Sequence, residues 1–263
     1  MPRARIILQR TLVRSNQYPN NQYGTQNLHR VEKNYFLTIT CLRRISPETR
    51  LCPRAADDSS FPDRILWTDE AIFKLNGHVN RHNCVYYAVE NPHIVITKEI
   101  NAPGITVWAG IWSGGLIGPF FFHDSVTANS YLEMLKKEII PAIKSRMNLQ
   151  EMFYMHDGAP SHYAQPVRHF LDKTFRNRWI GRRGAIEWPA RSPDLTPTDF
   201  FLWGVIKDYV YAKKPQNLQA LKDAIVTEMQ SLPAELCRKA CQTVPYRLQL
   251  CKDKEGEHIE QYL

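Results

Sequence analysis

No CxxC pair occurs in the 263 residues, and the six cysteines lie far apart in the chain. Their spacing excludes a zinc ribbon and a small disulfide scaffold, and it favours reduced thiols in an intracellular protein. The N-terminus has no apolar segment of the length that a signal peptide needs. No internal repeat and no low-complexity tract is present. The chain also lacks a GxSxG motif, which would carry a serine nucleophile, and a P-loop, which would bind nucleotide phosphates.

Charge is absent from residues 101–122, a stretch that resembles a membrane span at first sight. Five glycines and two prolines interrupt it. β-Branched and aromatic residues lie on both sides of a central Ser113-Gly114-Gly115. Two strands joined by a tight glycine turn explain this pattern better than a helix in lipid. The segment therefore predicts a β-hairpin over residues 104–122 and argues against a membrane protein.

The positive charge is concentrated at one end of the chain. Apolar residues make up 43% and charged residues 23% of the sequence, which is typical of a globular protein and excludes a wholly disordered chain or a collagen. The formal net charge is +8, and residues 1–55 alone hold 10 Lys and Arg residues against Glu32 and Glu48. A basic arm of this kind suggests a polyanionic partner such as nucleic acid. A solvated tail is the alternative interpretation.

Hydrophobic periodicity predicts a mixed α/β domain after a boundary near residues 57–60. Strands and helices alternate along the chain, with a well-marked helix start at Thr196-Pro197. The predicted strands are 64–69, the hairpin 104–122, 152–157 and 185–188. The predicted helices are 127–147, 162–175, the one that begins at Thr196, 217–230 and 233–250.

Two aspartates, Asp69 and Asp157, each end a short apolar run that reads as a strand. Adjacent strand ends in α/β sheets open onto the crevice where ligands bind, so these two carboxylates are candidate site residues. Glu70 takes the opposite face of its strand and is the weaker partner. The alternative for each aspartate is a role in capping a loop.

A third acid, Asp199, begins the helix face that continues with Leu202, Trp203 and Ile206. This spacing predicts a carboxylate directed inward toward the sheet. The alternatives are a capping-box role for Asp199 and a rival ligand in Asp194, whose loop position favours a turn. Three carboxylates in one cleft require a cation, and oxygen ligands favour Mg²⁺ or Mn²⁺. Two such ions can carry out phosphodiester displacement without an organic cofactor.

The order and spacing of several motifs resemble those of mariner-like transposases. The segments are WTDEA (67–71), NRHN (80–83), MHDGAPSH (155–162), RWIG (178–181) and WPARSPDLTPTDFFLWG (188–204). The resemblance covers about residues 62–263. Single motifs such as HDG are weak signals, but their combination is highly specific.

The resemblance implies an α/β, RNase H-like mixed sheet over residues 61–263, with an antiparallel hairpin and parallel strands flanked by helices. It implies a catalytic, metal-binding acidic triad of Asp69, Asp157 and Asp199 that holds two Mg²⁺ or Mn²⁺ ions. Asp69 and Asp157 would bridge the ions, and Asp199 would complete the second site. The implied reaction is hydrolysis and strand transfer on double-stranded DNA, at transposon ends and target, in the nucleus. Whether the chain forms a homodimer is left open.

The chain departs from the family between its second and third acids, where 41 residues separate Asp157 from Asp199. The extra length coincides with a basic cluster that we expect to bind a DNA backbone, with a solvated loop as the alternative. Its members are Lys173, Arg176, Arg178, Arg182, Arg183 and Arg191. Trp179 and Trp188 are interpreted as buried residues, with base stacking as the alternative. His156 and His162 are interpreted as packing residues or supports around the second acid.

Residues 1–60 form a basic arm that is too short for the paired helix-turn-helix modules that the family places before its catalytic domain. This predicts a truncated or degenerate copy in which recognition of specific DNA ends is weakened. A catalytically silent nucleic-acid-binding remnant is therefore the alternative function. A cellular RNase H-type nuclease is a third hypothesis, and the WPARSPDLTPTDFFLWG segment argues against it.

Overall fold

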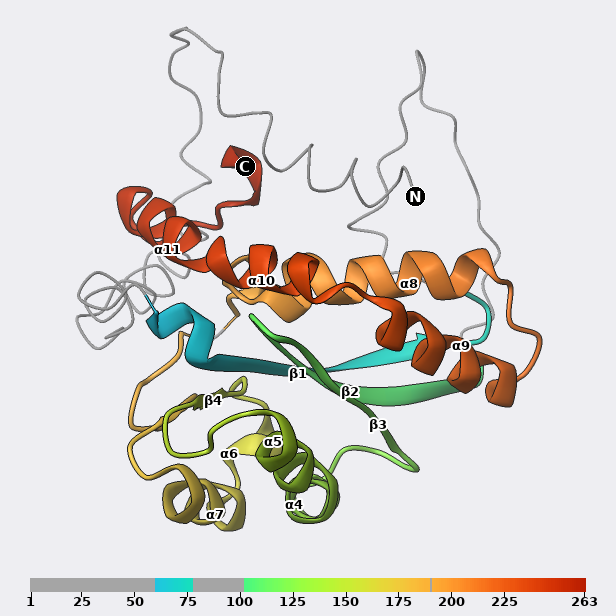
Figure 1. Ribbon diagram of the computed structural model, residues 1–263, viewed down its shortest axis with the longest axis horizontal. Helices are drawn as coiled ribbons and strands as arrows, with labels where there is room; N and C mark the ends of the chain where they lie inside the picture. The colour runs from blue at the N-terminus through green and yellow to red at the C-terminus, as the bar shows by residue number, and fades with distance from the viewer. Residues whose placement is uncertain (1–59, 78–101, 190) are drawn as a thin grey trace, which may run out of the picture.

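A five-stranded mixed sheet forms the centre of the computed structural model, which describes residues 60–77, 102–189 and 191–263 (Figure 1). The strand order is β3-β2-β1-β4-β5. The first three strands pair antiparallel, whereas β4 pairs parallel with both β1 and β5. The strands are β1 (Ile65–Lys74), β2 (Gly104–Trp112), β3 (Gly115–Phe122), β4 (Phe153–Met155) and β5 (Trp179–Ile180). The mixed α/β architecture predicted from the sequence is confirmed.

The uncharged segment forms the predicted hairpin. Strands β2 and β3 meet at Ser113-Gly114, and Trp112 pairs with Gly115 at the closed end. Gly115 adopts φ +132°, a conformation that residues with a side chain rarely enter, so the turn depends on glycine here. None of the helices in the described ranges combines the length and apolarity that a membrane crossing requires.

Strand β1 is longer than predicted, because it does not end at Asp69 but continues to Lys74. The reason is its partner: β2 pairs with β1 without interruption from Trp67 opposite Ile111 to Lys74 opposite Gly104. Asp69 therefore lies inside the strand rather than at its end. On the other side, β4 pairs only with the first three residues of β1. The sheet thus opens beside Asp69 on the β4 side.

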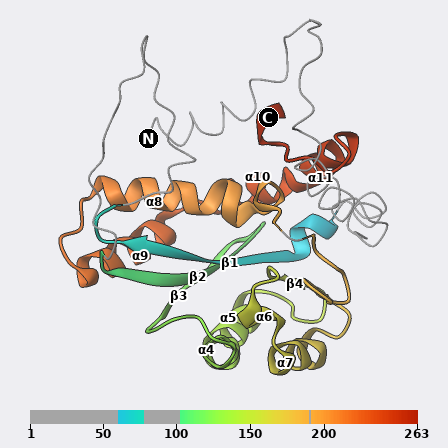
Figure 2. The ribbon, with the colours of Figure 1, turned by 180° about the vertical axis from the view of Figure 1, so that it is seen from behind.

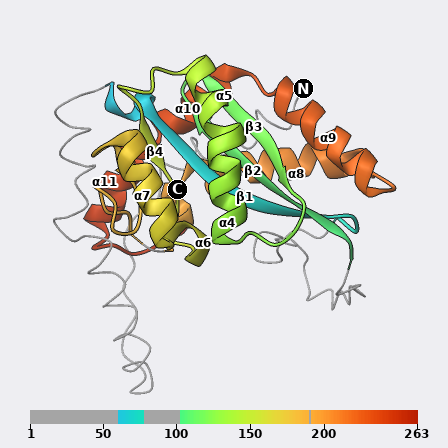
Figure 3. The ribbon, with the colours of Figure 1, turned by 90° about the horizontal axis from the view of Figure 1, so that it is seen from below.

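One face of the sheet is covered by helices from the middle of the chain (Figure 3). The predicted helix over 127–147 is confirmed, with a π-helical turn in its middle. Thr127 caps its start, since its side chain accepts from the backbone N–H of Ser130. The predicted helix over 162–175 begins earlier and is interrupted at Ala164. The elements are α4 (Ala128–Met134), the π turn η4 (Leu135–Ile139), α5 (Ile140–Arg146), α6 (Pro160–Tyr163) and α7 (Gln165–Phe175).

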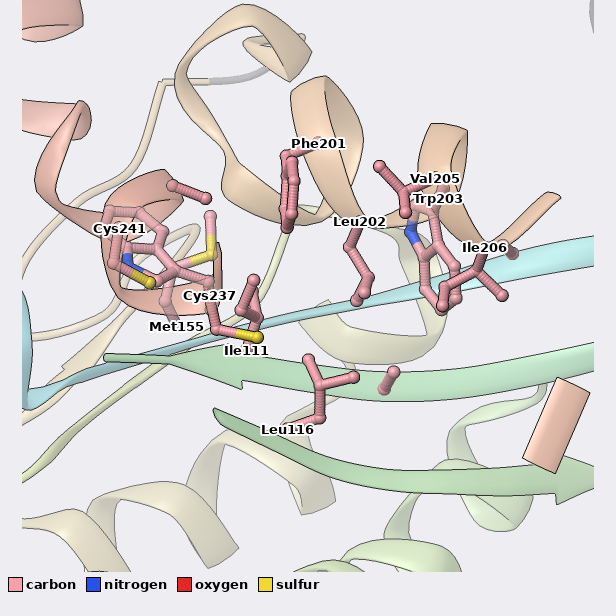
Figure 4. Packing of buried hydrophobic residues seen from close by; sticks show 14 of the residues in the cluster. Ile111, Leu116, Met155, Phe201, Leu202, Trp203, Val205, Ile206, Cys237 and Cys241 are labelled. Atoms are coloured by element: carbon pink, nitrogen blue, oxygen red, sulfur yellow. The ribbon is translucent and has the colours of Figure 1, made fainter. Parts of the chain in front are cut away.

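The opposite face is covered by the C-terminal helices, which lie on the far side of the sheet from α4–α7 (Figure 2). Side chains of the hairpin, such as Ile111 and Leu116, face those of Leu202 and Ile206 across this core (Figure 4). The predicted single helix over 233–250 is wrong, because the chain breaks at Thr243 ahead of Pro245, which lies in the first turn of the next helix. The elements are η6 (Thr198–Leu202), α8 (Trp203–Ala212), α9 (Leu218–Ser231), α10 (Ala234–Gln242) and α11 (Val244–Asp253). Short 3₁₀ turns are η2 (Phe61–Arg64), η5 (Pro193–Leu195) and η7 (Glu260–Tyr262).

The last strand was predicted in the wrong place. Residues 185–188 contribute only one bridge, between Ile186 and Ile180, whereas β5 itself is Trp179–Ile180. A tight turn closes with the N–H of Gly184 donating to the carbonyl of Gly181, and it folds the chain back on β5. Residues 185–188 therefore extend the sheet by a single bridge at Ile186 instead of forming a full strand.

Candidate active site

Strand register places the first two predicted acids at the same level of the sheet. Trp67 of β1 is the partner of Met155 in the parallel strand β4, and Asp69 and Asp157 each follow two residues later. The prediction that both acids face the opening beside the parallel strands is consistent with this register. The two carboxylates come from different local structures: Asp69 is held inside a strand, and Asp157 lies in the loop after one.

Asp69 is directed to the face covered by α8. The indole N–H of Trp203 donates to its Oδ2 at 2.8 Å. Burial raises the pKa of Asp69 well above its ordinary value, and repulsion from Asp199 and Glu70 raises it further. A carboxylate whose ionised form is this unfavourable gains from a nearby cation.

Asp157 is joined to Glu70 through a buried imidazole. His162, with a side chain 2% exposed, lies with Nδ1 2.6 Å from Asp157 Oδ1 and Nε2 3.2 Å from Glu70. Burial lowers the pKa of His162, but Glu70 and Asp157 outweigh it and raise the pKa to about 10. The ring is therefore protonated at neutral pH, and both nitrogens donate.

The pKa of Asp157 is shifted in the opposite direction to that of His162. Burial raises the pKa of this carboxyl, but the hydrogen bond and charge of His162 outweigh burial and lower the pKa below its ordinary value. The N–H of Ala159 donates to the same oxygen, Oδ1, at 3.0 Å. The side chain is 55% exposed, so Asp157 is an ionised acid open to solvent. Sequence reasoning placed Glu70 on the other face correctly, but it missed the connection through His162.

A buried aromatic layer supports the His162 ring. Its imidazole stacks on His156 with 4.9 Å between centroids and lies 4.2 Å from the Tyr131 ring. Burial and the charge of His162 lower the pKa of His156 well below its ordinary value, so His156 is neutral. Tyr131 completes the layer, since its hydroxyl lies 2.8 Å from that of Tyr154 and 3.2 Å from His156 Nδ1.

Asp199 lies in the π-helical turn η6, and its side chain is solvent-exposed. The predicted inward direction is therefore wrong. The i→i+5 hydrogen bonds of a π-helical turn shift the phase of the helix, so the spacing from Asp199 to Leu202 and Trp203 does not fix the face on which Asp199 lies. Surrounding atoms still desolvate the carboxylate, and Asp157 repels it, which together raise the pKa of Asp199 to about 7. Repulsion from Asp157 thus raises the pKa of Asp199, and repulsion from Asp199 raises the pKa of Asp69.

Lys207 is a cation that faces this acidic group. Burial lowers the pKa of its ammonium, while Asp69 and Asp199 act in the opposite direction. It follows Asp199 by about two helical turns along η6 and α8. Lys207 was not among the predicted site residues, although its position on the same helical segment as the third acid was a usable signal.

Asp194, the rival third ligand, belongs to the scaffold. Its side chain is fully buried, and its Oδ2 accepts the backbone N–H of Ile259 at 3.0 Å. Its Oδ1 lies 3.6 Å from Nδ1 of His258. Arg247 donates to the carbonyl of Asp194 at 2.8 Å and stacks over Phe200 at 3.7 Å. The turn expected at Asp194 is confirmed, and it fastens the last segment of the chain to the loop before Asp199.

Contacts are resolved for three of the six predicted DNA-binding residues. Arg178 donates to the carbonyl of Leu149 at 2.8 Å, which is a structural role. Arg182 and Arg183 come together over the ring of Tyr163. The remaining three, Lys173, Arg176 and Arg191, are exposed. Trp179 and Trp188 are buried, as expected. The segment 80–83 lies outside the described residues.

The loop that carries Arg182 packs closely on the loop that carries Asp157. A Cβ added to Gly181 would lie 2.7 Å from Cδ2 of the buried His156 ring and 3.1 Å from the His156 carbonyl. Gly158 faces the side chain of Arg182 at 3.4 Å by the same measure. Glycine at position 181 is therefore required by close approach rather than by backbone angle.

Gly181→Ala is expected to lower the free energy of unfolding by about 2 kcal/mol, because the stacked His156 ring has no room to move. Gly204 provides the opposite control: it is exposed in α8, and an added Cβ would meet nothing within 4 Å. Gly204→Ala should stabilise the protein by about 1 kcal/mol through helix propensity. Urea unfolding followed by tryptophan fluorescence measures both. Equal effects of the two substitutions would contradict the packing argument.

The carboxylates fit a divalent cation by donor type, since Mg²⁺ and Mn²⁺ prefer carboxylate oxygen. Within residues 60–77, 102–189 and 191–263, no three His, Cys, Asp or Glu side chains form a group that could hold a metal ion. An ion that takes two carboxylates and completes its shell with water and substrate oxygen does not need such a group.

No family model matches the chain. It is similar to the transposable element Tc3 transposase of Caenorhabditis elegans, with 22% identity over 190 residues that cover 70% of this chain and 54% of that protein. It is also similar to the histone-lysine N-methyltransferase SETMAR of Homo sapiens, with 23% identity over 209 residues that cover 76% of this chain and 29% of that protein. The chain thus spans about half the Tc3 transposase and less than a third of SETMAR.

Solved structures of the Mos1 transposase have the same fold. The Mos1 paired-end complex with the left transposon end matches with a TM-score of 0.67 and 19% identity, over 97% of this chain and 71% of that one. The Mos1 catalytic domain with raltegravir and Mn matches with a TM-score of 0.62 and 19% identity, over 90% of this chain and 100% of that one. These likenesses confirm the resemblance predicted from the sequence, which is to the RNase H-like catalytic domain of mariner-like transposases.

Proposed function

We propose that this chain is a DNA transposase catalytic domain that hydrolyses phosphodiester bonds at transposon ends and transfers the freed 3′ end to target DNA. The observation that carries the proposal is that Asp69, in β1, and Asp157, in the loop after β4, each follow by two residues a paired position of these neighbouring parallel strands. Asp199 interacts electrostatically with both carboxylates. The similarity to the Tc3 transposase supports it, as do the Mos1 structures with a transposon end and in a strand transfer complex.

In this proposal Asp69, Asp157 and Asp199 are the residues that would hold two Mg²⁺ or Mn²⁺ ions. When bound, such a pair of ions would supply an activated water and stabilise the leaving oxygen in phosphodiester displacement. Mos1 catalytic domain structures with Mn and with Mg support the choice of metal.

The protein groups around the acids have separate tasks in this proposal. His162 fixes Oδ1 of Asp157 and keeps the carboxylate ionised. Trp203 fixes Oδ2 of Asp69. The exposed Asp157 and Asp199 carboxylates leave the site accessible to a DNA strand from solvent. Because the three carboxylates would hold the metal and water would be the nucleophile, no nucleophilic side chain is needed.

The test is nicking of a supercoiled plasmid in Mn²⁺, with EDTA as the blank. Asp157→Ala should slow nicking by at least about a hundredfold, the order of loss seen when a transition-state contact is removed. Asp124→Ala, a change at an exposed acid after β3, should leave the rate unchanged. Equal nicking by the wild-type chain and Asp157→Ala would remove the catalytic assignment. Salt-sensitive DNA binding without any nicking would instead support a silent remnant.

A further inference from the structure

Three arginines converge on one tyrosine beside the second acid. The guanidinium carbons of Arg182, Arg168 and Arg183 lie 4.3, 4.9 and 5.6 Å from the centroid of the Tyr163 ring. Arg168 and Tyr163 were not among the predicted DNA-binding residues. Guanidinium planes are attracted to aromatic faces, so the ring restrains the direction of all three side chains.

Local backbone structure holds this Tyr163 cluster in place. Nε of Arg168 donates to the carbonyl of Tyr163 at 3.1 Å, which fixes the first turn of α7 against α6. Arg183 occupies the left-handed region with φ +57° in the tight turn after β5. A non-glycine residue in that region is uncommon, and its exposed side chain gains no burial there. The turn therefore presents Arg183 outward at a conformational cost.

The cluster lies next to the proposed catalytic centre. Tyr163 directly follows His162, whose ring is bonded to Asp157. Arg182 packs against Gly158, the residue after Asp157. A strand whose phosphate lies at Asp157 thus has the three guanidinium groups beside it. Helices α6 and α7, which carry Tyr163 and Arg168, lie on the same face of the sheet (Figure 3).

The charge of the cluster is not balanced by the surrounding protein. Among the described residues, no ion pair involves Arg168, Arg182 or Arg183. A hollow of about 450 Å³ adjoins Arg168 and is lined by Gln165, Pro166, His169 and Asp172. Asp172, the acid in that lining, already accepts the indole N–H of Trp179 at 2.8 Å. Three cations held this close together favour a ligand with more than one negative charge.

We infer that the Tyr163 cluster is a binding site for successive phosphates of the DNA strand that flanks the bond to be cleaved, with Tyr163 as the support that orders the arginines. The inference rests on the proposed function for its choice of ligand. Arginine suits this task because its fork bonds two phosphate oxygens at once. The contact is to the backbone, so it positions the strand and reads no sequence.

The experiment measures binding of the full chain to a 5′-labelled DNA duplex in EDTA, over a series of salt concentrations. Arg182→Gln/Arg183→Gln should weaken binding by about tenfold or more and lower the salt slope by about two, because two phosphate contacts are lost. Lys144→Gln/Lys252→Gln removes the same charge from exposed positions elsewhere and should change binding by less than about threefold.

Substitutions of Tyr163 test whether DNA binding requires arginines that are ordered by the ring or only their positive charge. Tyr163→Phe keeps the ring and should bind like the wild-type chain, whereas Tyr163→Leu keeps every charge but loses the ring face and should weaken binding several-fold. Thermal unfolding of each variant checks that the fold is intact. Equal binding by Tyr163→Phe and Tyr163→Leu would overturn the role of Tyr163. A lysine control that binds DNA as weakly as the arginine variant would overturn the site itself.

Failure of this inference can be told from failure of the proposed function. A wild-type chain that binds DNA tightly, with arginine variants that match the lysine control, overturns only the Tyr163 cluster. A wild-type chain that does not bind duplex DNA in EDTA overturns the cluster as a DNA site, while nicking in Mn²⁺ still decides the catalytic proposal. Tighter binding to duplex RNA than to DNA of equal sequence overturns the assignment of the ligand.

Discussion

Replacing His162 with alanine should lower the free energy of unfolding by about 3 kcal/mol, the lower end of the range for breaking a buried ion pair. The value lies at the lower end because Asp157 is exposed and can be hydrated by water when the imidazole is lost. Glu70, with a side chain 14% exposed, is the carboxylate left without its partner. The variant also loses the stacking of the ring on His156 and Tyr131. Urea unfolding at pH 7 measures the effect.

The pH dependence identifies the charge of His162 as the cause. The pKa of His162 is about 10 in the folded chain, above its unfolded value of 6.5. The stabilisation is therefore complete below pH 6.5 and is lost as the pH rises toward 10. The difference between wild type and His162→Ala should be largest at pH 6 and should narrow steadily up to pH 10. His123→Ala, an exposed control, should change stability by less than about 0.5 kcal/mol. A constant difference across this range would contradict the charged state.

Asp199→Asn should have opposite effects on stability and on activity. Nicking should fall by at least about a hundredfold, because the amide is a poor ligand for the second ion. The free energy of unfolding at pH 8 should rise by about 1 kcal/mol, a value reduced to allow for solvent screening of an exposed carboxylate. The gain comes from removing a charge that Asp157 repels and the surrounding atoms desolvate.

The sign of the pH effect is fixed by the direction of the pKa shift. Folding raises the pKa of Asp199 from 3.8 to about 7, so ionisation penalises the folded chain increasingly as the pH rises between these values. Wild type and Asp199→Asn should therefore be equally stable near pH 3.5 and differ most above pH 7. Addition of Mn²⁺ at pH 8 should stabilise wild type more than the variant and reduce the difference. Asp208→Asn, at an exposed position of α8, is the control. Stabilisation by Asp199→Asn at pH 3.5 would contradict this explanation.

Features that depend on neighbouring residues were predictable from the sequence. The hairpin followed from Ser113-Gly114-Gly115 between two β-rich runs, and the helix over 127–147 followed from its apolar spacing. The separation of Asp69 and Glu70 onto opposite faces required only the alternation of a strand. The matching positions of Asp69 and Asp157 agree with the same kind of local reasoning, because the carboxyl ends of neighbouring parallel strands point to the same edge of the sheet.

Features that depend on distant pairing were not predictable. The extension of β1 to Lys74 results from β2, which begins thirty residues later in the chain. His162 connects Asp157 with Glu70, which lies 92 positions before His162, and no local pattern marks that contact. The direction of Asp199 depends on a π-helical turn that apolar periodicity assumes to be absent. The buried role of Asp194 requires Ile259, 65 residues further along.

The bond between Asp194 and Ile259 makes one backbone amide a natural reporter on the loop that carries the third acid. An amide proton held by a fully buried carboxylate exchanges with solvent only when that contact opens. Deuterium uptake at Ile259 would thus record the opening of the Ser192–Asp199 region in real time. Ile259 lies outside the group of three acids, so the measurement would need no probe attached to Asp69, Asp157 or Asp199.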